Sequence, residues 1–199
     1  MNRIIFATGN EDKLKEIRMI LKDTGVEVVS MKEAGISAEI AEDGKTFEEN
    51  AVIKAKTVME LSSEAVLSDD SGLEIDALDG APGVHSARFM GTDTSYDIKN
   101  AAILEKLAGV PEEKRTARFV CAVVCALPDG RIFTCQRTME GRIGYEIRGK
   151  NGFGYDPIFY LPEYGCYSAE LSPEKKNEIS HRGKALRGMR AILKEELIL

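Results

Sequence analysis

The amino-acid sequence predicts an α/β fold in which helices flank a mixed central sheet. Short apolar runs alternate with amphipathic helical patterns over residues 3–75, as is typical of α/β proteins. Two strand-like runs, 116–127 and 131–138, flank a Pro-Asp-Gly turn and predict a β-hairpin in the later half. The chain has 199 residues and shows no linker or repeat, so we expect one domain over residues 1–199. We expect that domain to form two lobes with a cleft between them.

The first segment of the chain, residues 3–29, predicts a strand, a turn, a helix and a second strand. Arg3–Ala7 predicts a buried strand, and Val26–Val29 predicts a second one. Between them, Asn10 is a favourable N-cap and Gly25 a favourable helix stop. The predicted helix places one apolar stripe at steps of three and four residues: Leu14, Ile17, Ile20 and Leu21.

A second helix is predicted to begin after Thr46. Thr46 and Glu49 have the T-x-x-E spacing of a capping box. The inner side of this helix is expected to carry Phe47, Ala51, Ala55, Val58 and Met59. The helix leads into an apolar run, Ala65–Ser68, which predicts a strand that ends before Asp69.

The remaining elements follow the same logic. Leu73–Ile75 predicts a further short strand, and Thr94 or Ser95 caps a helix that runs through Leu107. Residues 141–147 are expected to extend the sheet. Ser180 is expected to open the last helix, with Ala185, Leu186, Met189 and Leu193 facing inward.

Composition excludes several classes of function. The net charge of −6 argues against a protein that neutralises the phosphates of a nucleic acid, although local lysines can still bind a small phosphorylated ligand. The four cysteines form no C-x-x-C pair and only two histidines are present, which argues against zinc. No apolar run has the length of a membrane helix or a signal peptide, so we expect a cytoplasmic protein without membrane partners.

Thr8-Gly9-Asn10-x-x-Lys13 lies at a strand-to-helix turn. A helix N-terminus exposes backbone amides and a partial positive charge, glycine permits close approach, and Lys13 lies one turn into the helix. These features suit a phosphate. An asparagine cap beside a solvated lysine explains the same residues. Asn50 and Lys54 lie one turn apart on the second helix, where an exposed helix face is the ordinary interpretation.

Asp69-Asp70-Ser71-Gly72 follows a predicted strand. Ligands of α/β sheets gather beyond the carboxyl ends of strands, and Mg²⁺ prefers oxygen ligands, often one or two carboxylates with substrate phosphates. Two aspartates there can hold an ion and a water that attacks phosphorus. A polar turn needs only one aspartate, which favours the functional interpretation.

Two later segments also carry chemistry. In Gly152–Pro157, two aromatic rings between glycines can stack on a base, and Asp156 can accept hydrogen bonds from it; packing of the rings into the core is the alternative. Lys176, His181 and Arg182 cluster around the start of the last helix. Cations are unfavourable at that end of a helix dipole, so a bound anion or base acceptor accounts for them, with a solvated basic turn as the alternative.

Taken together, six segments resemble the inosine triphosphate pyrophosphatase family in order and spacing. They are FATGNEDKLKEI, TFEENAVIKAK, SDDSGLEIDAL, GAPGVHSARF, GFGYDPIF and KNEISHRGKAL, and they cover nearly the whole chain. The resemblance implies a Mg²⁺-dependent hydrolase that cleaves dITP, ITP and XTP to the monophosphate and pyrophosphate, thereby cleansing the nucleotide pool. It also implies a two-lobed α/β homodimer.

The resemblance further implies the roles of individual residues. The metal-binding and general-base position falls on Asp70, and Glu42 is the best match for the further metal ligand, with Glu39 and Asp43 close by in the same loop. Ser71 and Lys54 contact substrate. Triphosphate contacts fall on the turn formed by Thr8, Gly9, Asn10, Glu11, Asp12 and Lys13. Base contacts fall on Phe153, Gly154, Tyr155, Asp156, Lys176, His181 and Arg182.

Two other functions fit part of this pattern. One is a pyrophosphatase for modified pyrimidine or methylated nucleotides, which needs the same phosphate chemistry. The other is a nucleotide sensor that binds without turnover. The aspartate pair argues against the sensor, because a phosphate binder gains nothing from added negative charge without a metal.

Overall fold

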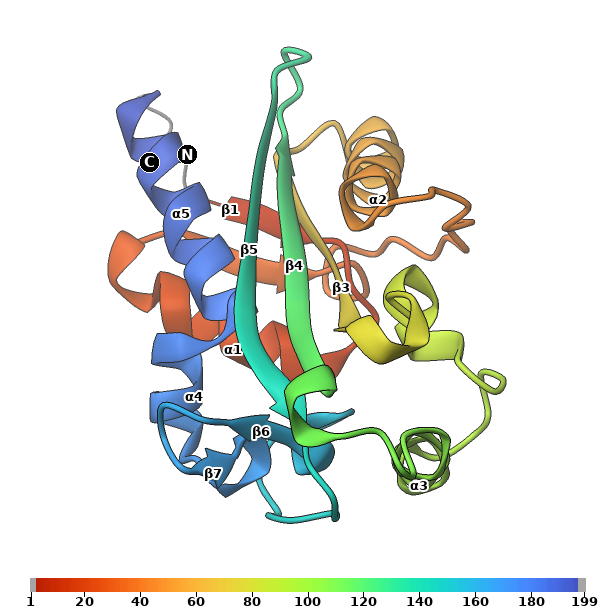
Figure 1. The fold of residues 1–199 in the computed structure, drawn as a ribbon. Coiled ribbons are helices and arrows are strands. Elements are labelled where there is room, and N and C mark those ends of the chain that lie inside the picture. Colours follow the sequence, from red (N-terminus) through yellow and green to blue (C-terminus); the bar gives the residue numbers. More distant parts are fainter. Residues whose placement is uncertain (1–2, 197–199) are drawn as a thin grey trace. The chain divides into compact units, whose positions relative to one another are not determined.

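A computed structural model describes residues 3–196 and shows a seven-stranded mixed sheet flanked by helices (Figure 1). The strand order is β2-β1-β3-β4-β5-β6-β7. β1 pairs in parallel with β2 and β3, whereas β6 pairs antiparallel with β5 and β7. The predicted fold class is therefore confirmed.

The elements have the following bounds. The strands are β1 Arg3–Phe6, β2 Glu27–Ser30, β3 Val66–Ile75, β4 Thr116–Ala126, β5 Ile132–Ile143, β6 Phe159–Leu161 and β7 Cys166–Tyr167. The α-helices are α1 Glu11–Leu21, α2 Phe47–Ser62, α3 Tyr96–Lys106, α4 Pro173–Ile179 and α5 His181–Glu195.

The chain divides into two compact units, each with its own apolar core. The first unit contains residues 3–70, 121–137 and 181–196; the second contains residues 71–120 and 138–180. No helix within residues 3–196 combines the length and apolar character needed to cross a bilayer. The expectation of a cleft stays a prediction.

The first unit is built around β1 and the beginning of β3. Phe6 and Leu67 pair across these two parallel strands and join one core with α1 and α5. Figure 1 shows α5 (blue) beside α1 (orange-red), and the two helices are in contact. The predicted stripe of α1 is confirmed at Leu14, Ile17 and Leu21, which are all buried.

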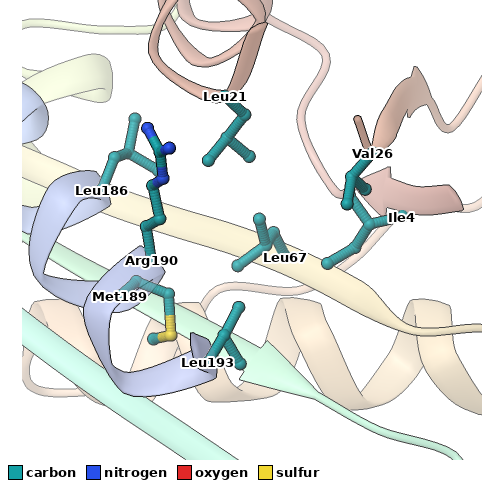
Figure 2. A pocket seen from close by; sticks show the side chains of 8 residues that line it. All are labelled: Ile4, Leu21, Val26, Leu67, Leu186, Met189, Arg190 and Leu193. Atoms are coloured by element: carbon teal, nitrogen blue, oxygen red, sulfur yellow. The ribbon is translucent and has the colours of Figure 1, made fainter. Parts of the chain in front are cut away.

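The core under α5 is closely packed. Figure 2 shows side chains of β1, α1, β3 and α5 around a small hollow of about 10 Å³, with Leu67, Met189 and Leu193 among them. Such a volume admits about one water, but an apolar lining offers it few hydrogen-bond partners. Dense packing of this kind fixes α5 against the sheet.

Local sequence signals explain the helix ends. Asn10 Oδ1 accepts hydrogen bonds from the N–H groups of residues 12 and 13, and Thr46 Oγ1 accepts from Glu49 N–H. The Glu49 carboxylate accepts from the N–H of residue 45 rather than from Thr46 itself. Gly25 takes a left-handed conformation with φ of 73°, where the turn after α1 requires glycine.

The prediction of two short strands around Asp69 and Asp70 is wrong. The structure has one strand, β3, from Val66 to Ile75, and both aspartates lie inside it. Most β3 residues are buried, and the polar residues Ser-Asp-Asp-Ser do not end the strand. Cations and hydrogen-bond donors from neighbouring helices compensate the two buried aspartates, as described below.

The second unit has a core formed by the end of β3, α3, the start of β4, the end of β5 and the chain around β6. Arg115 is fully buried there and donates hydrogen bonds to the backbone carbonyls of Leu107, Ile143 and Gly144. The prediction that Ser180 opens the last helix is confirmed for α5. Sequence analysis missed α4, which begins at Pro173 behind the N-cap Ser172 and ends one residue before Ser180.

Candidate active site

Asp69 and Asp70 lie next to each other in β3 but have separate surroundings. Successive side chains of a strand point to opposite faces of the sheet. Asp69 accordingly meets α1 and α5, whereas Asp70 meets α2. The alternation explains how two neighbouring carboxylates are tolerated, and it does not support the expectation that both hold one ion.

Asp69 is enclosed by cations. Its carboxylate lies 3.0 Å from Lys13 Nζ and 3.2 Å from Arg182 Nε, and the Asp69 side chain is fully buried. Burial alone raises the pKa of Asp69, but Lys13 and Arg182 outweigh it and hold the pKa well below its usual range. Asp69 is therefore a fixed anion that ties α1 and α5 to β3.

Arg182 extends this cluster to a second acid. Its guanidinium donates to Asp69 and, through Nη1, to Glu16 of α1. Lys13, Asp69, Arg182 and Glu16 alternate in sign and together carry no net charge. Burial lowers the pKa of Arg182, but the two carboxylates outweigh it, so the guanidinium remains charged.

Asp70 faces the first two turns of α2. Asn50 Nδ2 donates to Asp70 Oδ2 over 3.1 Å, and Lys54 Nζ lies 3.7 Å from Asp70 Oδ1. Asn50 and Lys54 are both buried, so the ordinary interpretation of an exposed helix face is wrong. Burial raises the pKa of Asp70 above its usual range, although Lys54 and Asn50 oppose this effect.

The ammonium of Lys54 lies between two carboxylates. It is 3.1 Å from Glu42 Oε2 and 3.7 Å from Asp70 Oδ1. Burial lowers the pKa of Lys54, but Asp70, Asp69 and Glu42 together outweigh it and raise the pKa. Glu42 is the half-buried member of the acidic loop, whereas Glu39 and Asp43 are exposed.

The turn from Thr8 to Asn10 is stabilised by its own side chains. Thr8 Oγ1 accepts from Asn10 N–H over 3.1 Å, and Asn10 Oδ1 caps α1. A Cβ at Gly9 would meet no atom within 4 Å, and Gly9 does not take a left-handed conformation. The chain's own packing therefore does not require glycine there, which is consistent with close approach of a ligand. Glu11 and Asp12 are exposed on the first turn.

A separate polar cluster surrounds Asp156 in the second unit. Asp156 is buried and accepts hydrogen bonds from Phe153 N–H (2.8 Å), Ser168 Oγ (2.8 Å) and Lys176 Nζ (2.6 Å). Lys176 Nζ also lies 4.7 Å from the centroid of the half-buried Phe153 ring. Asp156 and Lys176 therefore pair with each other, and Phe153 keeps part of its ring accessible.

The other predicted base contacts have distinct environments. Tyr155 is buried, donates from its hydroxyl to the Ser86 carbonyl and packs edge-on against Tyr96. Gly154 accepts from Asn100 Nδ2 through its carbonyl. His181 is buried at the first residue of α5, in the first unit, and Ser71 follows Asp70 in β3 as a half-buried residue.

Comparisons with known proteins agree over nearly the whole chain. The model of the Ham1 family matches residues 4–192. This chain belongs to the Ham1 family.

Two relatives and one solved structure illustrate the similarity. A dITP/XTP pyrophosphatase of Desulforamulus reducens is 51% identical to this Ham1-family chain over 191 residues, covering 96% of the chain and 95% of the relative. A dITP/XTP pyrophosphatase of Vibrio vulnificus is 46% identical over 198 residues and covers 98% of both. The structure of a HAM1 protein from Coxiella burnetii superposes with a TM-score of 0.90 at 40% identity, covering 98% of this chain and all of that one. The resemblance to the inosine triphosphate pyrophosphatase family is thus confirmed.

The carboxylates of this Ham1-family protein suit a hard divalent cation whose remaining ligands are waters and substrate phosphates. Asp70 and Glu42 offer carboxylate oxygens on either side of Lys54. Residues 3–196 contain no group of three or more histidine, cysteine or acidic side chains arranged to hold a metal. Mg²⁺ usually takes one or two carboxylates together with waters and substrate phosphates, so these two residues fit it.

Asn50 is a member of this site to which sequence analysis gave no role, although it noted the spacing from Lys54. It is fully buried and contacts Asp70 directly, yet a lone asparagine on a helix gives no sign of its partner. Its spacing from Lys54, one helical turn, was the available signal, since both side chains must then lie on one face.

Proposed function

We propose that this Ham1-family protein is a Mg²⁺-dependent pyrophosphatase that hydrolyses the deaminated purine nucleotides dITP, ITP and XTP. The products are the nucleoside monophosphate and pyrophosphate, and the cellular role is to cleanse the nucleotide pool. The observation that carries the proposal is the position of Asp70, a carboxylate buried next to Lys54 and Glu42. The names of the relatives support the substrate class.

Asp70 is proposed to activate water. The water oxygen forms a bond to the α-phosphorus while the bond from that phosphorus to the bridging oxygen breaks, and pyrophosphate leaves with the electron pair. The proton of the water passes to the Asp70 carboxylate. Burial favours this role because it raises the pKa of Asp70, and a base is more effective when its pKa approaches the working pH.

Cationic groups are proposed to neutralise the triphosphate. Lys54 and the turn from Thr8 to Lys13 supply an ammonium group and backbone amides for the phosphate oxygens, as in other helix-terminal phosphate sites. Glu42 and Asp70 are the proposed Mg²⁺ ligands. When bound, Mg²⁺ supplies charge neutralisation for the phosphate oxygens and the departing pyrophosphate.

Base selectivity is proposed to depend on hydrogen-bond donors. Hypoxanthine and xanthine carry an oxygen at C6 where adenine carries an amino group. Donors among Lys176, His181 and Arg182 are proposed to pair with that oxygen, whereas the amino group of adenine is itself a donor and cannot accept from them, which disfavours ATP. The Phe153 ring is proposed to stack on the base, and Ser71 to contact the substrate beside Asp70. We further propose a cytoplasmic homodimer.

The deciding experiment measures pyrophosphate release from ITP, dITP, XTP, GTP, ATP and modified pyrimidine triphosphates, with Mg²⁺ and with a chelator. We expect release from the first three nucleotides only, and only with Mg²⁺. Preference for a modified pyrimidine establishes the alternative pyrophosphatase. Binding of nucleotide without release of pyrophosphate establishes the sensor.

A further inference from the structure

Asn50 joins two chain segments through one side chain. Its Oδ1 accepts from Gly44 N–H over 2.8 Å, and its Nδ2 donates to Asp70 Oδ2 over 3.1 Å. A backbone N–H can meet only the oxygen of the carboxamide, and an ionised carboxylate can meet only its nitrogen. The two partners therefore fix the carboxamide in a single orientation.

The loop before α2 rests directly on Asn50. A Cβ at Gly44 would lie 2.7 Å from Asn50 Oδ1 and 2.8 Å from Glu49 Cβ, closer than real side chains approach. Only glycine fits there without displacing the loop. Gly44 is two residues beyond Glu42, so this contact also seats the segment that presents Glu42 to Lys54.

We infer that Asn50 is a positioning residue for hydrolysis: its carboxamide orients Asp70 and holds the Glu42 loop on α2. This inference rests on the proposed function. Lys54 also links Glu42 to Asp70, through a hydrogen bond to Glu42 and an ion pair with Asp70, but the same ammonium is proposed to serve the triphosphate. Asn50 contributes directional hydrogen bonds that persist when Lys54 turns to a phosphate.

The test compares two substitutions with a matched control. Asn50→Leu keeps the shape of the side chain and removes both hydrogen bonds. Asn50→Asp keeps the acceptor for Gly44 but loses the donor to Asp70. The control is Ser68→Ala, which removes another buried link between β3 and α2, the 2.6 Å hydrogen bond from Ser68 Oγ to the Ala51 carbonyl, without touching Asp70.

We expect both Asn50 variants to lower kcat by about 10- to 100-fold while KM changes by a small factor, as for other groups that orient a reactive carboxylate. Ser68→Ala lowers the thermal midpoint but leaves kcat within about twofold. Amide hydrogen exchange gives a readout independent of turnover. Exchange at Gly44 rises about tenfold in Asn50→Leu and stays near the wild-type rate in Asn50→Asp.

Gly44→Ala provides a second route, because it lifts the loop without changing the chemistry of any side chain in the site. We expect the same fall in kcat, and this variant decides the matter if Asn50→Leu does not fold. Values of kcat for the Asn50 variants within about threefold of Ser68→Ala overturn the inference. If wild-type protein releases no pyrophosphate from any nucleotide, the proposed function fails, whereas the exchange rates still report whether Asn50 holds the loop.

Discussion

At the scale of single residues, burial and charge separate the roles of two neighbouring aspartates. Asp69 is fully buried between Lys13 and Arg182, and its pKa is lowered. Asp70 lies beside Lys54, shares that ammonium with Glu42, and has a raised pKa. The cations stabilise ionised Asp69, whereas burial disfavours ionisation of Asp70, and a base benefits from that.

Asp70→Asn is expected to lower pyrophosphate release by about 10²- to 10⁴-fold, because the amide cannot accept a proton from water. The thermal midpoint is expected to stay the same or rise, since ionised Asp70 is unfavourable in the folded chain at neutral pH. Release assays and thermal unfolding of the same samples check both parts. Wild-type rates in this variant remove Asp70 from the mechanism.

Asp69→Asn is expected to lower the free energy of unfolding at neutral pH by about 3–5 kcal/mol, because Lys13 and Arg182 lose a buried partner. The pKa of Asp69 is lowered in the folded chain, so the unfolded chain takes up the proton first as pH falls. The stabilisation is therefore complete above about pH 4 and is lost progressively below it.

Urea unfolding of wild type and Asp69→Asn at a series of pH values measures this difference directly. The gap between the two proteins is expected to narrow as the pH falls below about 4. A gap that stays constant over this range argues against an ionised Asp69 as the source of the stabilisation.

At the scale of elements, close packing of α5 against β5 sets the position of Arg182. Gly188 lies on α5 opposite Cys135 of β5, and a Cβ there would lie 2.5 Å from Cys135 Sγ. A glycine inside a helix weakens it by about 1 kcal/mol relative to alanine. The close approach of helix to strand explains why glycine is nevertheless suitable at this position.

Gly188→Ala is expected to destabilise the protein, because an overlap of this kind costs about 1–3 kcal/mol and exceeds the gain in helix propensity. In a Cys135→Ala background the same substitution is expected to stabilise, since the opposing sulfur is gone. A double-mutant cycle by chemical denaturation measures the change of sign. Equal effects in both backgrounds contradict the packing argument.

Elements also show what the sequence can predict and what it cannot. The α1 stripe, the Asn10 and Thr46 caps and the hairpin around Gly130 depend on neighbours in sequence, and they are confirmed. The unbroken β3 and the burial of Asn50 depend on partners far along the chain. From sequence alone, consecutive polar residues predict a turn, because their distant partners cannot be identified.

At the scale of the whole molecule, the metal and the nucleotide are expected to bind together. The part of the chain that the structure describes offers no group of three or more metal-ligating side chains, and Lys54 already lies between Glu42 and Asp70. Substrate phosphates would complete the coordination of Mg²⁺.

Mg²⁺ alone is therefore expected to leave the thermal midpoint of the free protein unchanged, while removal of Mg²⁺ abolishes pyrophosphate release. Mg²⁺ together with a triphosphate analogue that carries a methylene bridge between the α- and β-phosphates is expected to raise the midpoint. Thermal unfolding with each component singly and with both separates these cases. A rise with Mg²⁺ alone points to a complete metal site in the protein itself.

The course of β3 also restricts how this protein can change in length. Since its side chains alternate between two faces, removing one residue upstream of Asp69 while β1 pairing is kept would turn each of the two acids to the opposite face of the sheet. Asp70 would then lie between Lys13 and Arg182, and Asp69 would face α2. Even a change of two residues, which restores the faces, would move each acid about 6.6 Å along the strand and away from its partners. The length of this stretch is therefore as restricted as its sequence.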